Sequence, residues 1–486
     1  MKILSTILAA GVTMSLSAQK KMNVLFIPID DLKPNTGACG NPFAHTPVMD
    51  KLASEGALFT NCFVQQAVSG PTRASLMTSL RPDRTRVWDL ETDFREKNPK
   101  AISMPEILIK NGYNTQAFGK VYHESSASPG HDAKSWSVPY TKVSKPTYAV
   151  SKGAPLAECA DVSDDTYSDG AMVQYVIDAI DKLAKDKNKP FFLAAGFHKP
   201  HMPFVAPKKY WDLFNRNDFT LEEFQEMSKN GPAIAYHNSA GVKKYSDIPQ
   251  FDSYSSNKNE HLSEDMQRYA LHGYHAATAY TDANIGKIIA YLEKKGLRDN
   301  TIIVIWGDHG WHLGDHGLWT KMTNFEQATK AFFVMSVPGK KQGIKPTTPC
   351  EFVDIFPTLF ELLGIEIPSW IDGKSLVKAM EDPDCQIKPY AMSQYPRGKV
   401  MGYTIRTPRY RYTEWINNFL TNQKYDPAKV VACEMYDYEK DPKETVNIVD
   451  DASYKAAAKE MKELFVQCME REYKANIAYD KRASWR

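Results

Sequence analysis

Short apolar runs that end abruptly at charged or imidazole side chains constrain the fold of this sequence more than any other feature. One run leads into Asp30-Asp31, another into Asp308-His309 and a third toward His198. Uninterrupted apolar runs of this length are typical of strands buried on both faces of a sheet. Since ligands bind beyond the carboxyl ends of such strands, we expect these polar residues to meet at one edge. The three runs are residues 21–29, 191–196 and 301–306, and residues 113–118 are a further expected strand.

Segments with helical spacing of apolar residues separate these runs. Thr46 and Pro47 predict the start of one helix and Gly56 its end, because threonine caps helices and proline is tolerated in the first turn. Residues 57–64 are expected to form another strand. Strands that alternate with helices predict an α/β fold, with a doubly wound sheet and helices on both of its faces. The other expected helices are residues 104–110, 171–184, 269–295 and 352–363.

The chain changes character after about residue 389. We expect a large α/β domain over residues 19–389 and a smaller C-terminal α+β domain over residues 390–486. The second region contains strand-like pieces at residues 401–406 and 410–415 and an expected polar helix at residues 454–473.

The formal net charge of +2 over 486 residues gives no electrostatic reason to expect nucleic acid as a partner. Residues 1–18 have the pattern of a secretory signal peptide, with Lys2 ahead of an apolar stretch and small residues at the end. A membrane anchor is the alternative, but the apolar stretch is shorter than the roughly 18 to 20 residues that a bilayer span requires. We expect an exported protein with no transmembrane span.

The two polar clusters at strand ends have the composition of a metal site. Adjacent carboxylates repel unless a cation or a proton lies between them, and hard oxygen ligands favour calcium or magnesium. A single Asp-Asp pair is more often a solvated loop or a helix cap. The presence of both Asp30-Asp31 and Asp308-His309 at predicted strand ends favours a metal.

The segment from Ser69 to Arg73 (SGPTR) follows a predicted strand and starts a predicted helix. This placement puts Ser69 near a helix N-terminus, where an anionic ester is stabilised. On this segment alone, the simpler interpretation is a serine cap with Pro71 in the first turn and Arg73 on the surface.

The same segment resembles the signature of the sulfatase family, (Cys or Ser)-x-Pro-x-Arg, whose first residue is converted to formylglycine. Further matches follow in order along the chain and are similar to the iduronate sulfatase branch, in which a histidine lies three positions after the lysine of the G-K motif. The matches are PIDDLKP at 28–34, GKVYH at 119–123, GFHKPHMPF at 196–204, GDHGWHLGDHG at 307–317, SQYPR at 393–397 and MGYTIRT at 401–407.

The resemblance implies an alkaline phosphatase-like doubly wound mixed sheet and a role for each matching residue. Calcium would be held by Asp30, Asp31, Asp308, His309 and the modified side chain of Ser69. Arg73 and Lys120 would neutralise and orient the formylglycine, His198 and Lys321 would contact the sulfate, and His123 would act as a base.

The implied chemistry begins with hydration of formylglycine to a geminal diol. One hydroxyl attacks sulfur, the sugar alkoxide leaves, and His123 removes a proton from the second hydroxyl to expel sulfate. Two departures from the signature bear on maturation. Ser69 replaces the cysteine of the animal enzymes, which resembles bacterial sulfatases matured by a radical enzyme before export, and Ser79 stands where the signature has glycine.

The resemblance also implies a substrate and a location. The expected substrate is the 2-O-sulfate of a non-reducing-end uronic acid in heparin, heparan or chondroitin fragments, and the expected location is the periplasm. His201, Trp311 and His312 are candidates for the sugar pocket, with His201 and His312 as donors to the uronate carboxylate. Residues 125–165 and 215–261 are expected to be surface insertions, where specificity often resides.

Three alternatives remain open on the sequence. The chain could be a sulfatase for another sulfated sugar, or a phosphoesterase or phosphonate hydrolase that uses the same metal site with a serine nucleophile. The mass of the Ser69 peptide discriminates, because formylglycine formation removes two hydrogens. A non-catalytic glycan-binding protein is the third alternative, and it has no need of an acid-base pair.

Overall fold

The computed structural model describes residues 21–127, 130–186, 189–251, 254, 260–418 and 423–482. The predicted signal peptide, residues 1–18, lies outside this range. Within the described part of the chain, no helix combines the length and the apolarity that a bilayer span requires.

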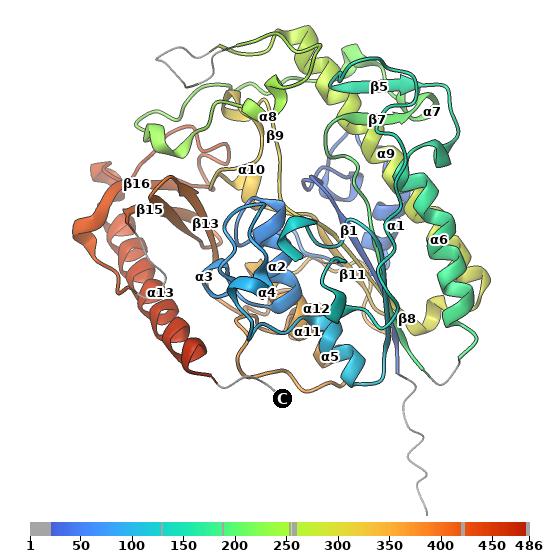
Figure 1. Ribbon diagram of the computed structural model, residues 1–486. Helices are drawn as coiled ribbons and strands as arrows, with labels where there is room; N and C mark the ends of the chain where they lie inside the picture. Colours follow the sequence, from blue (N-terminus) through green and yellow to red (C-terminus); the bar gives the residue numbers. More distant parts are fainter. Residues whose placement is uncertain are drawn as a thin grey trace, which may run out of the picture.

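A six-stranded mixed sheet lies at the centre of the molecule (Figure 1). Its strands, in spatial order, are β2 (Ala57–Leu58), β11 (Phe333–Ser336), β8 (Thr301–Gly307), β1 (Asn23–Ile29), β6 (Phe191–Gly196) and β4 (Asn114–Gly119). The three predicted apolar runs form β8, β1 and β6, and the expected strand at residues 113–118 forms β4; the four strands are adjacent and parallel. β11 runs antiparallel to both β8 and β2, which makes the sheet mixed. The polar residues that follow the parallel strands therefore emerge at one edge.

Helices cover both faces of this sheet, as predicted. Alternate side chains of β1 point to opposite sides of the sheet, so each face presents apolar side chains that the helices bury. Val24 and Phe26 pack in one apolar cluster and Leu25 and Ile27 in another. The first cluster includes side chains of α2 (Ser69–Thr78), α5 (Met104–Lys110) and α11 (Ile355–Leu362). The second includes side chains of α1 (Pro47–Ser54), α6 (Ser168–Leu183) and α9 (Glu264–Lys294), of which α6 and α9 form the outer layer on the right of Figure 1.

Two local predictions were wrong in detail. The expected strand at residues 57–64 is interrupted by a turn at Thr60-Asn61, so it forms β2 and a separate strand β3 (Cys62–Phe63). β3 pairs with β12 (Cys350–Glu351) outside the main sheet. Thr46 precedes α1 as expected but makes no side-chain cap bond. The carboxylate of Asp282 on α9 accepts from the first backbone N–H groups of α1 instead.

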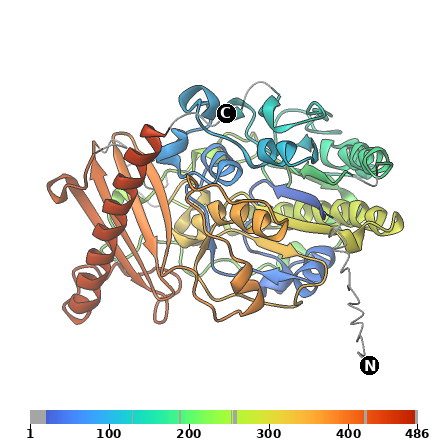
Figure 2. The same ribbon diagram turned by 90° about the horizontal axis from the view of Figure 1, so that it is seen from below.

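A four-stranded antiparallel sheet and a long helix form the C-terminal region (Figure 2). The helix, α13 (Lys455–Lys481), packs its apolar face on the sheet through Phe465 and Met469. It extends eight residues beyond the predicted end at 473, and Tyr479 in this extension packs in the core of the large sheet. The strands are β13 (Ala391–Arg397), β14 (Val400–Arg406), β15 (Tyr410–Asn417) and β16 (Val430–Asp437). The division of the chain at residues 389 and 390 remains a prediction.

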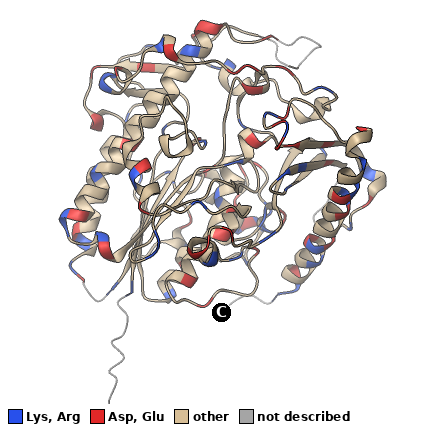
Figure 3. Cartoon of the chain, turned by 180° about the vertical axis from the view of Figure 1, so that it is seen from behind, with Lys and Arg blue, Asp and Glu red and all other residues tan. Residues whose placement is uncertain are grey.

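Basic and acidic residues are interspersed along the helices seen from behind (Figure 3), in line with the small net charge. Smaller two-stranded sheets complete the large region. They are β5 (Ala157–Ala160) with β7 (Phe204–Pro207) and β9 (His312–Leu313) with β10 (Trp319–Thr320).

Candidate active site

Three carboxylates meet where β1 and β8 end. Asp30, Asp31 and Asp308 are fully buried, and the Asp31 amide donates to Asp308 Oδ1 at 2.9 Å. The register of the two strands produces this meeting, because Ile29 of β1 pairs with Gly307 of β8 and the next residues are the aspartates. The predicted convergence of the two polar clusters is therefore present in the structure.

His309 presents one ring nitrogen to these carboxylates. Its Nδ1 lies 2.9 Å from the Gly310 carbonyl, which can only accept, so Nδ1 carries the proton and Nε2 keeps its lone pair. Nε2 lies 3.5 Å from Asp31 Oδ1 and 3.5 Å from Asp308 Oδ1. Burial lowers the pKa of His309 to about 4, so the ring is neutral near pH 7 and can act as a metal ligand.

Ser69 is the first residue of α2 and is directed at the same cluster. Its hydroxyl donates to Asp30 Oδ1 at 3.2 Å and lies 3.4 Å from His309 Nε2. The N-cap position of the helix is Val68, not Ser69. Ser69 therefore borders the carboxylate cluster, and the simpler interpretation as a helix cap is wrong.

Arg73 lies four residues further along α2, on the same helical face as Ser69. Its side chain is fully buried, so the expectation of a surface arginine is also wrong. Its guanidinium donates to Asp308 Oδ2 at 3.0 Å and to Asp30 Oδ1 at 3.2 Å. Two further cations complete the cluster: Lys120 bonds Asp30 Oδ2, and Lys321 bonds Asp31 Oδ1 at 2.6 Å.

The two adjacent carboxylates differ in their electrostatics. Burial would raise the pKa of Asp30, but the surrounding positive charges, Lys120 foremost, outweigh burial and hold that pKa well below its usual value. Burial raises the pKa of Asp31 to about 7, because the charge of Lys321 only partly offsets it and Asp30 and Asp308 add to it. Of these two adjacent carboxylates, Asp31 is the one whose charge is less compensated by nearby cations.

The donor set fits a divalent cation with hard-ligand preference. The ligand atoms of Asp31, Asp308 and His309 lie within 4.8 Å of one another, as do those of Asp30, Asp31 and His201. The buried Asp31 Oδ2 has no hydrogen-bond partner within the described part of the chain. An open carboxylate oxygen beside other oxygen ligands and one imidazole suits calcium or magnesium.

Ser79 ends α2 in a conformation that explains the usual glycine of the signature. Its φ of 52° lies in the left-handed region, which glycine adopts without steric cost. The Ser79 hydroxyl donates to the Val353 carbonyl at 2.6 Å and accepts from the Gly373 amide at 3.2 Å. These two bonds hold the serine in place at the end of the helix that carries Ser69.

A cavity of about 350 Å³ adjoins the cluster and contains three predicted site residues, Lys120, His123 and His198. Burial, with the nearby charge of Lys120, lowers the pKa of His123 to about 4. His123 Nδ1 has no hydrogen-bond partner among the described residues. The His198 side chain is about half exposed, and its Nδ1 lies 3.4 Å from Asp169 Oδ1.

The three candidates for the sugar pocket occupy different surroundings. His201 Nε2 lies 3.7 Å from Asp31 Oδ2, so His201 borders the carboxylate cluster. Trp311 is buried in an apolar cluster and lies under Lys321, whose ammonium is 4.8 Å from the ring centroid. His312 is fully buried, with Nδ1 bonded to Asp315 and Nε2 2.8 Å from Thr323 Oγ1. No ring nitrogen of His312 is therefore left for a substrate.

Sequence reasoning missed residues that line or shape the cavity. Asp169 on α6 accepts from the amides of His198 and Lys199 and so holds the loop after β6. Lys199 is partly buried, and desolvation lowers its pKa to about 8. His131 lies in the segment that we expected to be a surface insertion, yet it lines the cavity. None of these residues follows a strand directly, so no local pattern identifies them.

The fold and this site together define an alkaline phosphatase-like hydrolase of anionic esters. The Sulfatase family model matches residues 22–365, and the model named N-sulphoglucosamine sulphohydrolase, C-terminal, matches residues 314–471. The chain is 31% identical over 517 residues to iduronate 2-sulfatase of Mus musculus, with 90% of this chain and 92% of that protein covered. The chain belongs to the sulfatase family and is a sulfuric ester hydrolase, as the resemblance predicted.

Two further relatives show how widely this architecture is used. A Delta 4,5-hexuronate-2-O-sulfatase of Bacteroides thetaiotaomicron is 26% identical over 459 residues, which cover 90% of this chain and 86% of that protein. The crystal structure of a phosphonate monoester hydrolase of Agrobacterium radiobacter superposes with a TM-score of 0.75 at 20% identity, with 93% of this chain and 96% of that chain covered. At this identity the second likeness shows the fold alone.

Proposed function

We propose that this protein hydrolyses the 2-O-sulfate of a non-reducing-end uronic acid in heparin, heparan or chondroitin fragments, with a formylglycine formed from Ser69 and a bound calcium ion. The observation that carries the chemistry is the position of Ser69 Oγ, between Asp30 Oδ1 and His309 Nε2 at the start of α2. The substrate is supported by two relatives, an iduronate 2-sulfatase and a hexuronate 2-O-sulfatase.

Asp30, Asp31, Asp308 and His309 would hold the calcium ion. When present, calcium and formylglycine supply charge stabilisation at the sulfuryl oxygens and a hydrated aldehyde as the nucleophile. The three carboxylates already face three cations, Arg73, Lys120 and Lys321. A divalent ion adds net positive charge to this balanced cluster, and such a surplus suits an anionic sulfate ester.

The remaining residues position the ester and move protons. Arg73 fixes Asp30 and Asp308 from the helix that carries residue 69. His123 is neutral near pH 7 and has an open Nδ1, so it can accept a proton at the reacting centre. His198 faces the same cavity and is accessible to the leaving oxygen. Lys321, beside Asp31, offers a second positive charge to the sulfate.

Maturation and export complete the proposal. A serine at position 69 requires a radical maturase that forms the aldehyde before export, and residues 1–18 would direct the chain to the periplasm. The protein purified from a host without that maturase is expected to carry unmodified Ser69 and to be inactive.

The deciding experiment measures sulfate release by the matured protein from a panel of defined disaccharides. We expect activity on 2-O-sulfated uronates and little on 6-O- or N-sulfated glucosamine. The mass of the Ser69 peptide, two hydrogens below that of serine, is measured on the same sample and confirms maturation. A clear preference for glucosamine sulfates would overturn the substrate and leave the sulfatase chemistry standing.

A phosphonate monoester hydrolase is a second candidate, because a protein of that name has the same fold. Both activities would use the same carboxylate cluster. Parallel assays with aryl sulfate and phenyl phosphonate esters compare them directly, and a larger kcat/KM for the phosphonate would favour the second candidate.

A further inference from the structure

The cavity that adjoins the carboxylate cluster is lined by three predicted site residues and also by residues that have no role in the reaction at sulfur. Its inner part holds Lys120, His123 and His198. Its outer part is formed by the segment that follows β4, with His131, Tyr140, Lys142 and Lys145 among its lining residues. This outer part is lined mainly by hydrogen-bonding and cationic side chains.

His131 is a buried imidazole in the lining of this outer part, and one of its ring nitrogens has no hydrogen-bond partner among the described residues. The residue is 7% exposed, and its Nδ1 has no hydrogen-bond partner within the described part of the chain. The ring stacks on Tyr140 with 4.1 Å between centroids. Tyr140 is itself fixed, because its hydroxyl donates to the Gly119 carbonyl at 3.0 Å. A buried polar atom without a partner is costly unless a ligand or water meets it.

Two lysines add positive charge at the mouth. Lys142 is 60% exposed at its side chain, and its ammonium lies 2.8 Å from Glu124 Oε1. Lys145 is exposed beside it in the lining. The other acidic residue of the lining, Asp169, is occupied by the backbone amides of His198 and Lys199. Glu124 is therefore the one lining carboxylate, among the described residues, that opposes an incoming anion.

We infer that His131, Lys142 and Lys145 form a subsite for a second anionic group of the substrate, a carboxylate or a sulfate on the sugar that bears the scissile ester or on the next sugar. The inference rests on the proposed function, because it assumes that the ester is cleaved at the Ser69 end of the cavity. His131 supplies the directional contact from a fixed position. The exposed lysines supply charge, which alone is worth little at a surface.

The test compares substrates with and without a second anion. The readout is the ratio of kcat/KM for a 2-O-sulfated uronate disaccharide to kcat/KM for 4-nitrophenyl sulfate, which carries only the ester. In the matured Lys142→Gln/Lys145→Gln double variant we expect this ratio to fall roughly tenfold, mostly through KM of the disaccharide. In His131→Phe, which keeps the ring stacked on Tyr140, we expect a fall of similar size.

A matched pair of variants separates recognition from folding. Glu124→Gln removes the competing carboxylate, so we expect the ratio to rise, a gain that a purely structural role of the segment would not produce. Lys134→Gln lies in the same segment but outside the lining, and we expect the wild-type ratio. An unchanged ratio in the double variant, or a fall in Glu124→Gln, would overturn the subsite.

Two substrate changes identify the anion. Methyl esterification of the uronate removes the carboxylate charge, and replacement of N-sulfate by N-acetyl on the neighbouring glucosamine removes the second sulfate. We expect one of the two changes to abolish the difference between wild type and the double variant. A wild-type enzyme that prefers another sulfated sugar would overturn the proposed function, and the same variants assayed on that sugar would still decide the subsite.

Discussion

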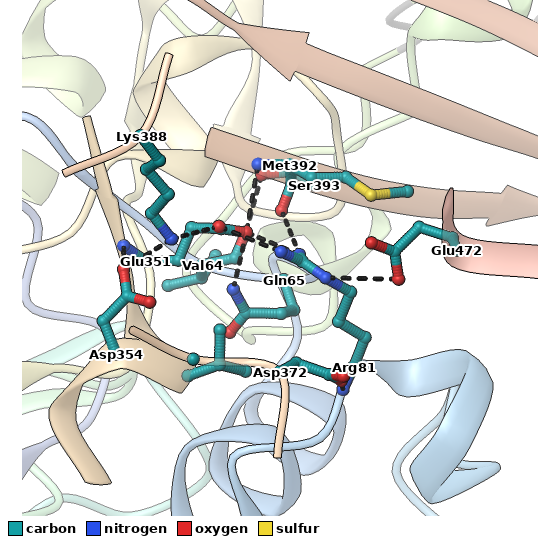
Figure 4. A network of polar contacts seen from close by, with 12 residues as sticks. Val64, Gln65, Arg81, Glu351, Asp354, Asp372, Lys388, Met392, Ser393 and Glu472 are labelled. Carbon is teal, nitrogen blue, oxygen red and sulfur yellow. Dashed lines mark hydrogen bonds and ion pairs between the residues drawn. The ribbon is translucent and has the colours of Figure 1, made fainter. Parts of the chain in front are cut away.

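Two clusters of buried charged side chains lie in this molecule, and they differ in whether every carboxylate oxygen has a hydrogen-bond donor. One is the carboxylate cluster of Asp30, Asp31 and Asp308 at the ends of β1 and β8. The other joins the large sheet to the C-terminal region (Figure 4), where Arg81 donates to both oxygens of Glu351 and Lys388 bridges Glu351 and Asp354.

Every carboxylate oxygen of the second cluster has a donor. Arg84 bonds Glu472 on α13 at 2.8 Å, and its Nε bonds Asp372 at 2.7 Å. Arg84 also donates to Asn476 at 2.7 Å, which fixes the end of α13. Burial would raise the pKa of Glu472, but the charges of Arg84, Arg81 and Arg471 outweigh it and lower that pKa to about 2.

The carboxylate cluster has an open oxygen, Asp31 Oδ2, and a hydroxyl and an imidazole directed into it. In the described part of the chain, the second cluster has no carboxylate oxygen without a donor and no imidazole bonded to its carboxylates, and none of its residues lines the cavity. A cluster in which every carboxylate oxygen has a donor can hold two regions together. A cluster that has a carboxylate oxygen without a donor, and that lies beside a cavity, can bind an ion and a substrate. Substitutions in the carboxylate cluster should therefore lower activity, and substitutions in the second cluster should lower the free energy of unfolding.

The largest effect is expected from Ser69→Ala. Loss of the nucleophile should lower kcat by a factor on the order of 10³ or more. The free energy of unfolding should change by less than about 1 kcal/mol, since only one hydroxyl is removed. Sulfate release and urea unfolding measure the two quantities, and substantial residual turnover in the alanine variant would contradict the assigned nucleophile.

His123→Gln should lower kcat by a factor of about 10² to 10⁴, the usual contribution of a positioned base. Because the pKa of His123 is about 4, the wild-type kcat should fall as the pH decreases through that value and the imidazole becomes protonated. The variant should lack this acidic limb. A wild-type limb that persists in His123→Gln would assign the titration to another group.

Asp308→Asn should remove calcium and lower turnover by more than about 100-fold, since loss of a ligand exceeds the effect of outer-sphere changes. Calcium content by elemental analysis and kcat are measured together. Asp282→Asn, which removes a buried carboxylate that caps α1, is the control and should keep its calcium. Full calcium occupancy in Asp308→Asn would refute the metal site.

Glu351→Gln should show the opposite pattern. Removal of its charge leaves the buried Arg81 without its main partner and the buried Lys388 with Asp354 alone, which costs about 3 kcal/mol or more in the free energy of unfolding. The kcat per folded molecule should stay near that of the wild type. A Glu351→Gln variant with the wild-type free energy of unfolding but a lower kcat would contradict the division into a catalytic cluster and a stabilising cluster.

The smallest effect concerns acid stability. The folded-state pKa of Glu472 is about 2 against an ordinary value of 4.5, so its ionised form stabilises the fold above pH 4.5 and this contribution is lost as pH falls toward 2. Glu472→Gln should lower stability at pH 7 and flatten the decline between pH 4.5 and 2. Equal slopes in both proteins, measured by urea unfolding at several pH values, would contradict the shift.

Local pattern was sufficient for the four adjacent parallel strands of the large sheet and for the residues that follow β1 and β8 directly. Asp30, Asp31 and Asp308 were predictable because apolar runs of uniform burial end at them. His312 shows where the same approach fails: its neighbours in the sequence suggest a pocket, but Asp315 and Thr323 occupy both of its ring nitrogens. The hydrogen-bond partners of a side chain depend on tertiary contacts, which the periodicity of the sequence does not indicate.

The sequence by itself determined which strands are followed by the polar residues of the site. It also determined that a helix begins at Ser69, and to which family the chain belongs. Tertiary structure alone decided that Arg73 is buried, that His131 faces the cavity and that α13 continues to reach Arg84. The physical reason is the sequence separation between the residues that interact. Helix and strand periods reflect neighbours within a few residues, whereas Arg84 and Glu472 are 388 residues apart and meet only when both regions have packed.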